Sequence, residues 1–119
     1  MKKRGTLTIH AGRSLFANPW IELTAYEVSA PSGRRFEYTT VDFKRAATGV
    51  VPLHDDGTVT LVGQHRFPLD VFSWELPEGG AEPSEPPLAA IQRELAEEAS
   101  LAARNWREIL KMHLSNSVT

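Results

Sequence analysis

Three glutamates close together in this sequence offer the oxygen ligands that a hard divalent cation binds. Glu94, Glu97 and Glu98 stand at positions i, i+3 and i+4 of a run of good helix formers, so they share one helix face. Like charges at this spacing repel one another, and a bound cation would turn the repulsion into attraction. The alternative interpretation is an acidic helix face that is solvated and has no chemical role.

A glycine-containing turn comes just before this helix. The segment Leu76-Pro77-Glu78-Gly79-Gly80 predicts a tight turn whose exposed backbone could offer a carbonyl group to the same cation. Glycine permits close backbone approach to a phosphate, and a metal ion neutralises phosphate charge. The turn and the carboxylate helix together favour phosphate chemistry.

The spacing of these residues resembles the Nudix box, G-x5-E-x7-R-E-U-x-E-E-x-G-U, in which U is aliphatic. Gly79, Glu85 and the run Arg93–Leu101 fit it with the spacing intact, and seven of the eight positions after the first glycine match. The departure is Ser100, which stands where the family has a glycine that helps to end the helix. We expect the metal site to tolerate this serine.

The resemblance implies a role for each box residue. Glu94 and Glu98 would be the principal Mg²⁺ ligands, with Mn²⁺ as a possible substitute, and Glu97 would be a further ligand or a water-orienting base. These three glutamates form the expected catalytic set, and the carbonyl group of Glu78 would be a backbone ligand. Gly79, Glu85 and Arg93 would be structural, with the last two forming an ion pair that fixes the loop against the helix.

The segments Gly63–Arg66 and Trp74–Gly79 resemble the ADP-ribose pyrophosphatase branch of the family. Members of the family cleave a nucleoside diphosphate linked to a further group. In that branch the implied substrate is ADP-ribose or a related nucleotide sugar, so the implied products are AMP and a sugar phosphate. Arg66 would contact the diphosphate. Trp20 and Phe36 would sandwich the adenine, with Glu37 as a partner for the base, although ordinary packing is the alternative for both aromatic residues.

The elements that must position these residues follow from hydrophobic pattern and turn chemistry. The sequence predicts a weak strand at residues 6–10, a hairpin, a second hairpin around Asp56-Gly57, a short strand, one helix and a last strand. The hairpin strands are 20–28 with 36–43, and 46–53 with 58–62; the short strand is 72–76, the helix 88–99 and the last strand 106–114.

This order of elements is that of an α+β domain. The resemblance implies an α/β/α Nudix sandwich around a mixed sheet, with residues 1–45 as an N-terminal antiparallel β extension and residues 46–119 as a partial Nudix core. In the resembled branch the extension commonly exchanges between subunits, so we expect a homodimer. Complete members continue with further strands and a helix, so we expect either a sequence that is incomplete at its C-terminus or an unusually short member. No residue of this sequence can be assigned the role of the later catalytic glutamate of that branch.

Composition limits the other function classes. The 119 residues include no cysteine, which excludes thiolate metal sites. Their formal net charge of −2 argues against nucleic-acid partners. No signal peptide or membrane span is apparent, so we expect a cytoplasmic protein. The resemblance implies a small-molecule nucleotide as its substrate. Two alternatives stay open: another Nudix branch, acting on GDP-sugars, dinucleoside polyphosphates or capped RNA, and a non-catalytic nucleotide-binding module.

Overall fold

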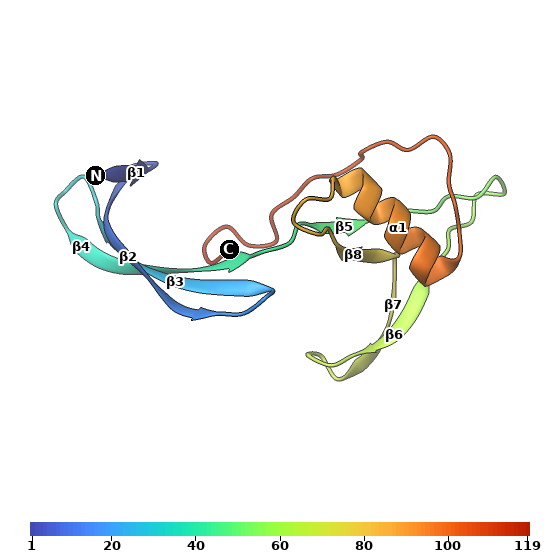
Figure 1. Cartoon of the computed structure of the whole chain (residues 1–119), viewed down its shortest axis with the longest axis horizontal. Coiled ribbons are helices and arrows are strands. Elements are labelled where there is room, and N and C mark those ends of the chain that lie inside the picture. The colour runs from blue at the N-terminus through green and yellow to red at the C-terminus, as the bar shows by residue number, and fades with distance from the viewer. The chain divides into compact units, whose positions relative to one another are not determined.

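The computed structural model describes residues 1–119, and the chain forms two compact units (Figure 1). The N-terminal unit consists of Met1–Lys44 together with Leu110–Thr119, and the box unit consists of Arg45–Ile109. Residues 110–119, which the sequence division assigned to the second domain, therefore lie in the first unit. No helix in the structure is long and apolar enough to cross a membrane.

The N-terminal unit is a four-stranded antiparallel sheet in the order β1-β2-β3-β4. Its strands are β1 (Lys2–Arg4), β2 (Leu7–Ala17), β3 (Ile21–Ser29) and β4 (Arg35–Phe43). The first predicted hairpin is confirmed as β3–β4. In the turn that joins these strands, Gly33 has a φ of 86°, a conformation that glycine adopts without strain.

The strand predicted at residues 6–10 is in fact the first part of the much longer β2. Its pairing with β3 shifts register between Ile9 and Ala11 and again between Ser14 and Phe16. Such bulges interrupt the alternation of inward and outward side chains. The sequence pattern breaks at the same places, which explains why the strand was predicted too short.

The strand predicted at residues 106–114 is not formed. No helix or strand follows Ala99. A strand requires the backbone groups of a neighbour, and this segment has none beside it. The last residues instead contact β4: the Val41 amide donates to the Val118 carbonyl group at 2.8 Å, and the Tyr38 hydroxyl donates to the Ser117 carbonyl group at 2.7 Å.

The box unit combines two small antiparallel sheets with one helix. Strand β5 (Ala47–Gly49) pairs with β8 (Glu78–Gly80), strand β6 (Val62–Arg66) pairs with β7 (Val71–Glu75), and the helix is α1 (Pro87–Ala99). The helix contacts β8 and β5. Its buried residues are Ala90, Ile91 and Leu95, whereas Leu88 at the start of the predicted apolar stripe is half exposed.

The predicted helix is confirmed and begins one residue earlier than expected. Pro87 occupies its first turn, where a missing N–H group costs no hydrogen bond, and Ala90 donates to the Pro86 carbonyl group at 3.0 Å. The helix ends at Ala99, and the following Ser100 adopts a left-handed conformation with a φ of 55°. That is the position at which the Nudix box has glycine.

The second predicted hairpin is formed only close to its turn. The His54 amide donates to the Thr58 carbonyl group at 2.9 Å and Gly57 has a φ of 83°. Beyond the turn, the pairing consists of a bridge between Leu53 and Val59 and a hydrogen bond of 3.3 Å from the Thr60 amide to the Pro52 carbonyl group. The longer pairing is β6 with β7, which was not predicted. Turn chemistry is local, whereas the choice of a strand partner depends on the rest of the unit.

The predicted α+β class and the antiparallel N-terminal extension are confirmed. Every strand pair within these residues is antiparallel, and α1 is the one helix that the chain forms. For the box residues, the important contact is that of α1 on β8, because it brings the carboxylate helix against the glycine-containing strand.

Candidate functional site

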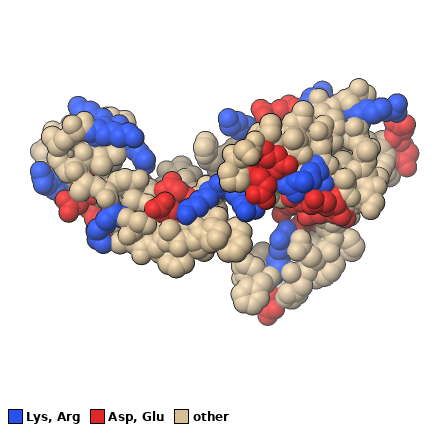
Figure 2. Space-filling view, in the orientation of Figure 1, with Lys and Arg blue, Asp and Glu red and all other residues tan.

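The carboxylates of α1 lie on the part of the helix that is not buried, and Figure 2 shows acidic side chains gathered over the helix and interleaved with basic ones. The side chain of Glu94 is 15% exposed and that of Glu97 is 59% exposed. Glu94 is therefore close to the underlying strand, while Glu97 faces solvent. The exposure of the carboxylate oxygens thus increases from Glu94, beside the strand, to Glu97, in solvent.

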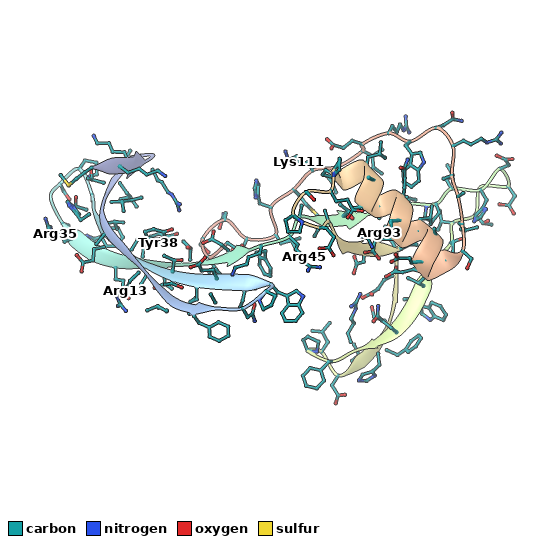
Figure 3. The ribbon with its side chains drawn as sticks, viewed as in Figure 1. Arg13, Arg35, Tyr38, Arg45, Arg93 and Lys111 are labelled. Carbon is teal, nitrogen blue, oxygen red and sulfur yellow. The ribbon has the colours of Figure 1, made fainter.

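Arg93 binds both the loop before the helix and the carboxylates on it (Figure 3). The expected ion pair with Glu85 is present and bidentate, with Nε and Nη2 each 3.0 Å from a carboxylate oxygen. The same guanidinium donates through Nη1 to Glu94 at 3.0 Å and to Glu97 at 3.2 Å, which the sequence analysis did not predict. The Arg93 guanidinium lowers the pKa of Glu85, and Glu85 raises the pKa of Arg93.

The loop between β8 and α1 is fixed by further contacts. The Glu82 amide donates to Glu85 at 3.1 Å, and the side chain of Glu82 pairs with Arg45 near the start of β5 at 3.0 Å. Arg93 also approaches the Gly80 carbonyl group at 3.4 Å. These bonds hold the loop against both the strands and the helix, which is the structural role expected of Glu85 and Arg93.

The backbone of β8 lies directly against the carboxylates. The Glu78 amide donates to Oε2 of Glu98 at 3.2 Å. A Cβ atom placed on Gly79 would overlap the Glu94 carboxyl group, so the absence of a side chain is required here for steric reasons. The Gly79 carbonyl group accepts a hydrogen bond from the Thr48 hydroxyl of β5 at 2.9 Å, which fixes the strand in turn.

The donor set fits a hard divalent cation in its chemistry, because it consists of carboxylate oxygens beside strand backbone. The side chains are not gathered around one point, however, and no group of three acidic or histidine side chains is positioned to hold a metal ion. Each carboxylate instead accepts a hydrogen bond from the protein. Glu94 and Glu97 share Arg93 as the donor, and Glu98 accepts from the Glu78 amide.

Arg66, the expected diphosphate contact, projects from the end of β6 towards β8. Its Nε lies 2.9 and 3.0 Å from the two carboxylate oxygens of Glu75, and its Nη2 lies 3.0 Å from Glu78. The hydrogen bonds with Glu75 raise the pKa of Arg66, and Arg66 lowers the pKa of Glu75. The predicted arginine and the box residues are thus brought together within one unit.

Glu75, which holds Arg66, was not predicted from the sequence. The signal that could have found it is the run Phe67-Pro68-Leu69-Asp70, whose turn-forming residues separate two extended segments and so predict a hairpin. Once β6 is paired with β7, strand alternation places Arg66 and Glu75 on the same face.

Trp20 and Phe36, the expected adenine sandwich, lie in the N-terminal unit and far apart along its hairpin. Phe36 pairs with Val28 near the turn, whereas Trp20 precedes Ile21 at the other end of β3. Eight residues of strand separate these positions, roughly 25 Å at about 3.3 Å per residue. One copy of the chain therefore does not bring both rings onto one base.

The immediate surroundings of these residues are polar or open. Trp20 is 61% exposed, Glu37 pairs with Arg13 at 2.9 Å, and the Arg34 guanidinium lies 5.4 Å from the centre of the Phe36 ring. None of the three predicted residues lines the cavity of about 210 Å³ in this unit.

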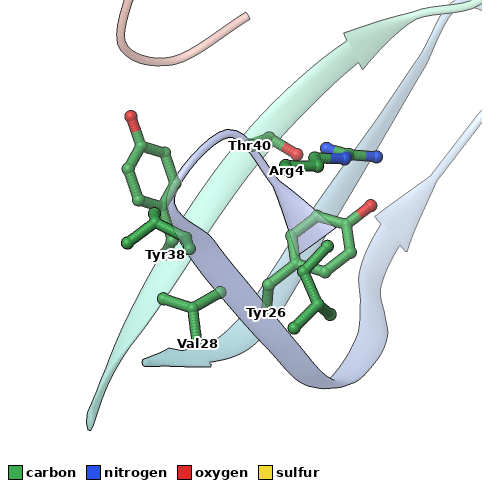
Figure 4. A pocket seen from close by; sticks show the side chains of 7 residues that line it. Arg4, Tyr26, Val28, Tyr38 and Thr40 are labelled. Carbon is green, nitrogen blue, oxygen red and sulfur yellow. The ribbon is translucent and has the colours of Figure 1, made fainter. Parts of the chain in front are cut away.

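That cavity has an apolar lining with one cation at its edge (Figure 4). The guanidinium of Arg4 lies 5.0 Å from the centre of the Tyr26 ring, a distance at which a cation is attracted to the face of an aromatic ring. Tyr38 contributes a second ring to the lining, while its hydroxyl is engaged by Ser117. The cavity is separate from the box residues, since it belongs to the other unit.

Fold and site together define an α+β domain in which a carboxylate-bearing helix is held by an arginine against a glycine-containing strand. Residues 43–119 match the NUDIX domain family, and the chain belongs to that family. The family match covers both sheets of the box unit, α1 and the loop between β8 and α1, and it includes every box residue from Gly79 to Leu101.

Three curated relatives are similar over most of this chain. A CMP-5'-(N-acetyl-N-hydroxy-3-aminopropyl)phosphonate hydrolase from Streptomyces rubellomurinus is 30% identical over 90% of the chain and 48% of its own length. ADP-ribose pyrophosphatases from Bacillus subtilis and Mycobacterium tuberculosis are 30% and 31% identical, each over 88% of the chain and over 56% and 48% of their own lengths. The chain thus spans about half the length of these relatives.

A solved structure supports the fold independently. The crystal structure of an ADP compounds hydrolase superimposes with a TM-score of 0.74 over 88% of this chain and 57% of that protein. The two sequences are 22% identical, so the likeness establishes a shared fold.

Proposed function

We propose that this chain carries the catalytic box of a Mg²⁺-dependent pyrophosphohydrolase, with Mn²⁺ as a possible substitute. The substrate is a nucleoside diphosphate linked to another group, ADP-ribose or a related nucleotide sugar, and the products are AMP and a sugar phosphate. The observation that carries the proposal is the set Glu94, Glu97 and Glu98 on α1, packed against β8 within a matched Nudix domain. The names of two relatives support ADP-ribose as the substrate.

In this proposal the box residues bind the cation and orient water. Glu94 and Glu98 are the principal ligands, the carbonyl group of Glu78 is a backbone ligand, and Glu97 is a further ligand or the base that orients the attacking water. Bound Mg²⁺ supplies neutralisation of the diphosphate charge and a more acidic water molecule. Glu94 and Glu97 would give up their hydrogen bonds with Arg93 to hold the cation, and Arg93 would stay paired with Glu85, so the loop would keep its position.

Arg66 binds the diphosphate in this proposal. Its Nε and Nη2 atoms are engaged by Glu75 and Glu78, whereas no group of the chain accepts a hydrogen bond from its Nη1 atom. The two N–H groups on Nη1 are therefore available for phosphate oxygens. The side chain is 33% exposed, so a ligand can reach it from solvent.

The N-terminal unit contributes base binding and dimer formation in this proposal. Trp20 and Phe36 stack on the adenine and Glu37 contacts its edge, but the separation along the β3–β4 hairpin requires the two rings to come from different copies of the chain. Exposed apolar residues on this unit, among them Phe16, Trp20 and Phe43, support burial against a second copy. A cytoplasmic location is part of the same proposal.

A second candidate substrate is the 5′ end of an RNA. An RNA pyrophosphohydrolase from Caulobacter vibrioides is 39% identical over half of this chain, which favours this branch as the alternative. A net charge of −2 opposes it, because RNA binding requires clustered cations. A non-catalytic Nudix module is less well supported, since all the box carboxylates are present.

The test is release of AMP from ADP-ribose by the purified 119-residue chain, with and without Mg²⁺, beside a panel of GDP-sugar, dinucleoside polyphosphate and capped RNA. Glu98→Gln should lower Mg²⁺-dependent turnover by at least about 100-fold, because removing even an outer partner of a metal site costs about 10- to 100-fold. The control is Glu108→Gln, an exposed glutamate outside the box, which should leave turnover unchanged. Equal turnover in the two variants would remove Glu98 from the site.

A further inference from the structure

We infer that Glu75 is a positioning residue that fixes the Arg66 guanidinium for a diphosphate ligand. The inference rests on the proposed function, because it concerns how that substrate class is bound. Glu75 does not touch the ligand in this account; it acts through Arg66.

The geometry of the pair restricts the guanidinium to one orientation. Arg66 Nε donates to both oxygens of Glu75, and Nη2 donates to Oε1 of the same carboxylate. The side chains are 33% and 20% exposed, so the pair is partly shielded from competing water while Arg66 remains accessible.

The register of the hairpin determines which residues form this pair. Arg66 is opposite Val71 and Glu75 is opposite Val62, so both side chains lie on one face of β6–β7 and the Arg66 side chain extends along that face to reach Glu75. The other face holds Phe72 and Trp74, whose rings make an edge-to-face contact at 5.3 Å. Gly63 leaves room for both rings, because a Cβ atom there would meet them at under 3 Å.

A continuous series of hydrogen bonds leads from the hairpin to the box helix. Arg66 Nη2 donates to the Glu78 side chain at 3.0 Å, and the Glu78 amide donates to Glu98 at 3.2 Å. The orientation of Arg66 is therefore tied to the strand that contacts the box carboxylates. The free Nη1 group is held at a fixed place relative to them within the same unit.

The charge of Glu75 by itself opposes binding of an anionic ligand. A carboxylate beside the phosphate site repels phosphate, so its net benefit must come from orienting the guanidinium, whose planar arrangement of N–H groups binds phosphate with directional specificity. The two effects predict opposite changes in diphosphate affinity when Glu75 is removed. If only charge mattered, removing Glu75 would strengthen diphosphate binding; if positioning dominates, removing it weakens binding.

The experiment is a double-mutant cycle on the 119-residue chain with Arg66→Ala, Glu75→Ala and the double variant. Binding of inorganic pyrophosphate in the presence of Mg²⁺ is measured by calorimetry, and hydrolysis of each panel substrate is measured in parallel. Glu75→Ala should weaken pyrophosphate binding about tenfold in the wild-type background, a typical coupling for residues in one hydrogen-bond network. In the Arg66→Ala background the same change should have less than about a twofold effect.

Two conservative variants separate positioning from charge. Glu75→Gln keeps an acceptor for Arg66 and should recover part of the binding lost in Glu75→Ala. Asp70→Asn removes the same charge from the same hairpin at a side chain that is 95% exposed and paired only with His65, so it should not weaken binding. Circular dichroism of every variant is the control for retention of the fold.

The outcomes distinguish this inference from the proposed function. Tenfold weakening that disappears in the Arg66→Ala background supports the positioning role, even if no panel substrate is hydrolysed and the proposed function is rejected. Hydrolysis with unchanged or tighter binding in Glu75→Ala overturns the positioning role alone. Additive effects of the two substitutions, or wild-type protein that binds no pyrophosphate, overturn it as well.

Discussion

At the scale of single residues, Gly79 shows how a position without a side chain shapes the site. The backbone of β8 approaches α1 so closely at Gly79 that a Cβ atom would occupy the space of the Glu94 carboxyl group. Gly49 on the neighbouring strand β5 has no such restriction, because the nearest atoms to a Cβ atom there lie at 3.9 Å. The two glycines share a sheet, but only Gly79 lies against a side chain of α1, that of Glu94.

We therefore predict that Gly79→Ala displaces Glu94 and lowers the affinity for Mg²⁺ by about tenfold or more, as loss of support around a metal site does. Gly49→Ala is the matched control and should change that affinity by less than about twofold, since it adds a Cβ atom only at van der Waals distance. Titration of Mg²⁺-dependent turnover measures both. Equal Mg²⁺ affinity in the two variants would contradict the steric role of Gly79.

Glu85 provides a prediction on pH. Its pKa in the folded protein lies below its ordinary value of 4.5, with the hydrogen bond from Arg93 as the main cause. A depressed carboxyl pKa stabilises the fold at pH values above the unfolded-state pKa, and the contribution is lost as the pH falls through the folded-state pKa. The loss should therefore occur on the acid side of pH 4.5.

The melting temperatures of the wild type and Glu85→Gln, measured from neutral pH into strong acid, test this. The wild type should be more stable at neutral pH, and the difference should shrink below pH 4.5 until it vanishes when Glu85 is protonated. A difference that stays constant across the whole range would show that the Glu85–Arg93 pair does not stabilise the loop through charge.

At the scale of elements, α1 is defined by its two ends. Prolines start it, and Ser100 ends it in a left-handed conformation whose amide donates to the Ala96 carbonyl group at 3.0 Å. Glycine adopts this conformation without the penalty of a Cβ atom, which gives a steric reason for the glycine in the box. The chain keeps the cap geometry with a less suitable residue.

Ser100→Gly should accordingly increase the free energy of unfolding by about 0.5–1 kcal/mol, measured by urea denaturation. Ala99→Gly is the matched control, because it places the same residue inside the helix and should decrease that free energy by about 0.5–1 kcal/mol. A Ser100→Gly protein that is less stable than the wild type would mean that the serine side chain makes a compensating contribution.

At the scale of the whole molecule, the residues proposed to bind the base lie in a different unit from the box. The box residues and Arg66 lie in one unit, whereas Trp20, Phe36 and Glu37 lie in the other. Within the N-terminal unit the two rings lie at opposite ends of the β3–β4 hairpin. A single copy is thus unable to form the proposed aromatic sandwich, and two copies are required.

This requirement predicts complementation between variants. Trp20→Ala and Phe36→Ala alone should each raise the KM for ADP-ribose roughly tenfold, because loss of one stacking ring costs on the order of 1–3 kcal/mol. Mixed dimers made by co-refolding the two variants should recover one intact site and one doubly damaged site, and hence up to about half of the wild-type activity at low substrate concentration. Mixed dimers with no recovery would show that the rings do not act on one base across the dimer.

The sequence by itself determined the local features of this protein. Residue spacing identified the box from Gly79 to Leu101, helix propensity predicted α1 to within one residue, and composition predicted the turn of the β3–β4 hairpin. These features depend on neighbouring residues along the chain, which is the information that periodicity and turn chemistry contain. The ion pair of Glu85 with Arg93 was also accessible, because the box pattern contains both residues.

Tertiary structure alone decided which distant segments meet. The turn residues 67–70 indicate a hairpin, but the register of β6 on β7, and with it the contact of Arg66 with Glu75, was settled only by the folded unit. The same holds for the failure of residues 106–114 to form a strand. A strand exists only beside a neighbour that satisfies its backbone hydrogen bonds, and that neighbour is supplied by the fold.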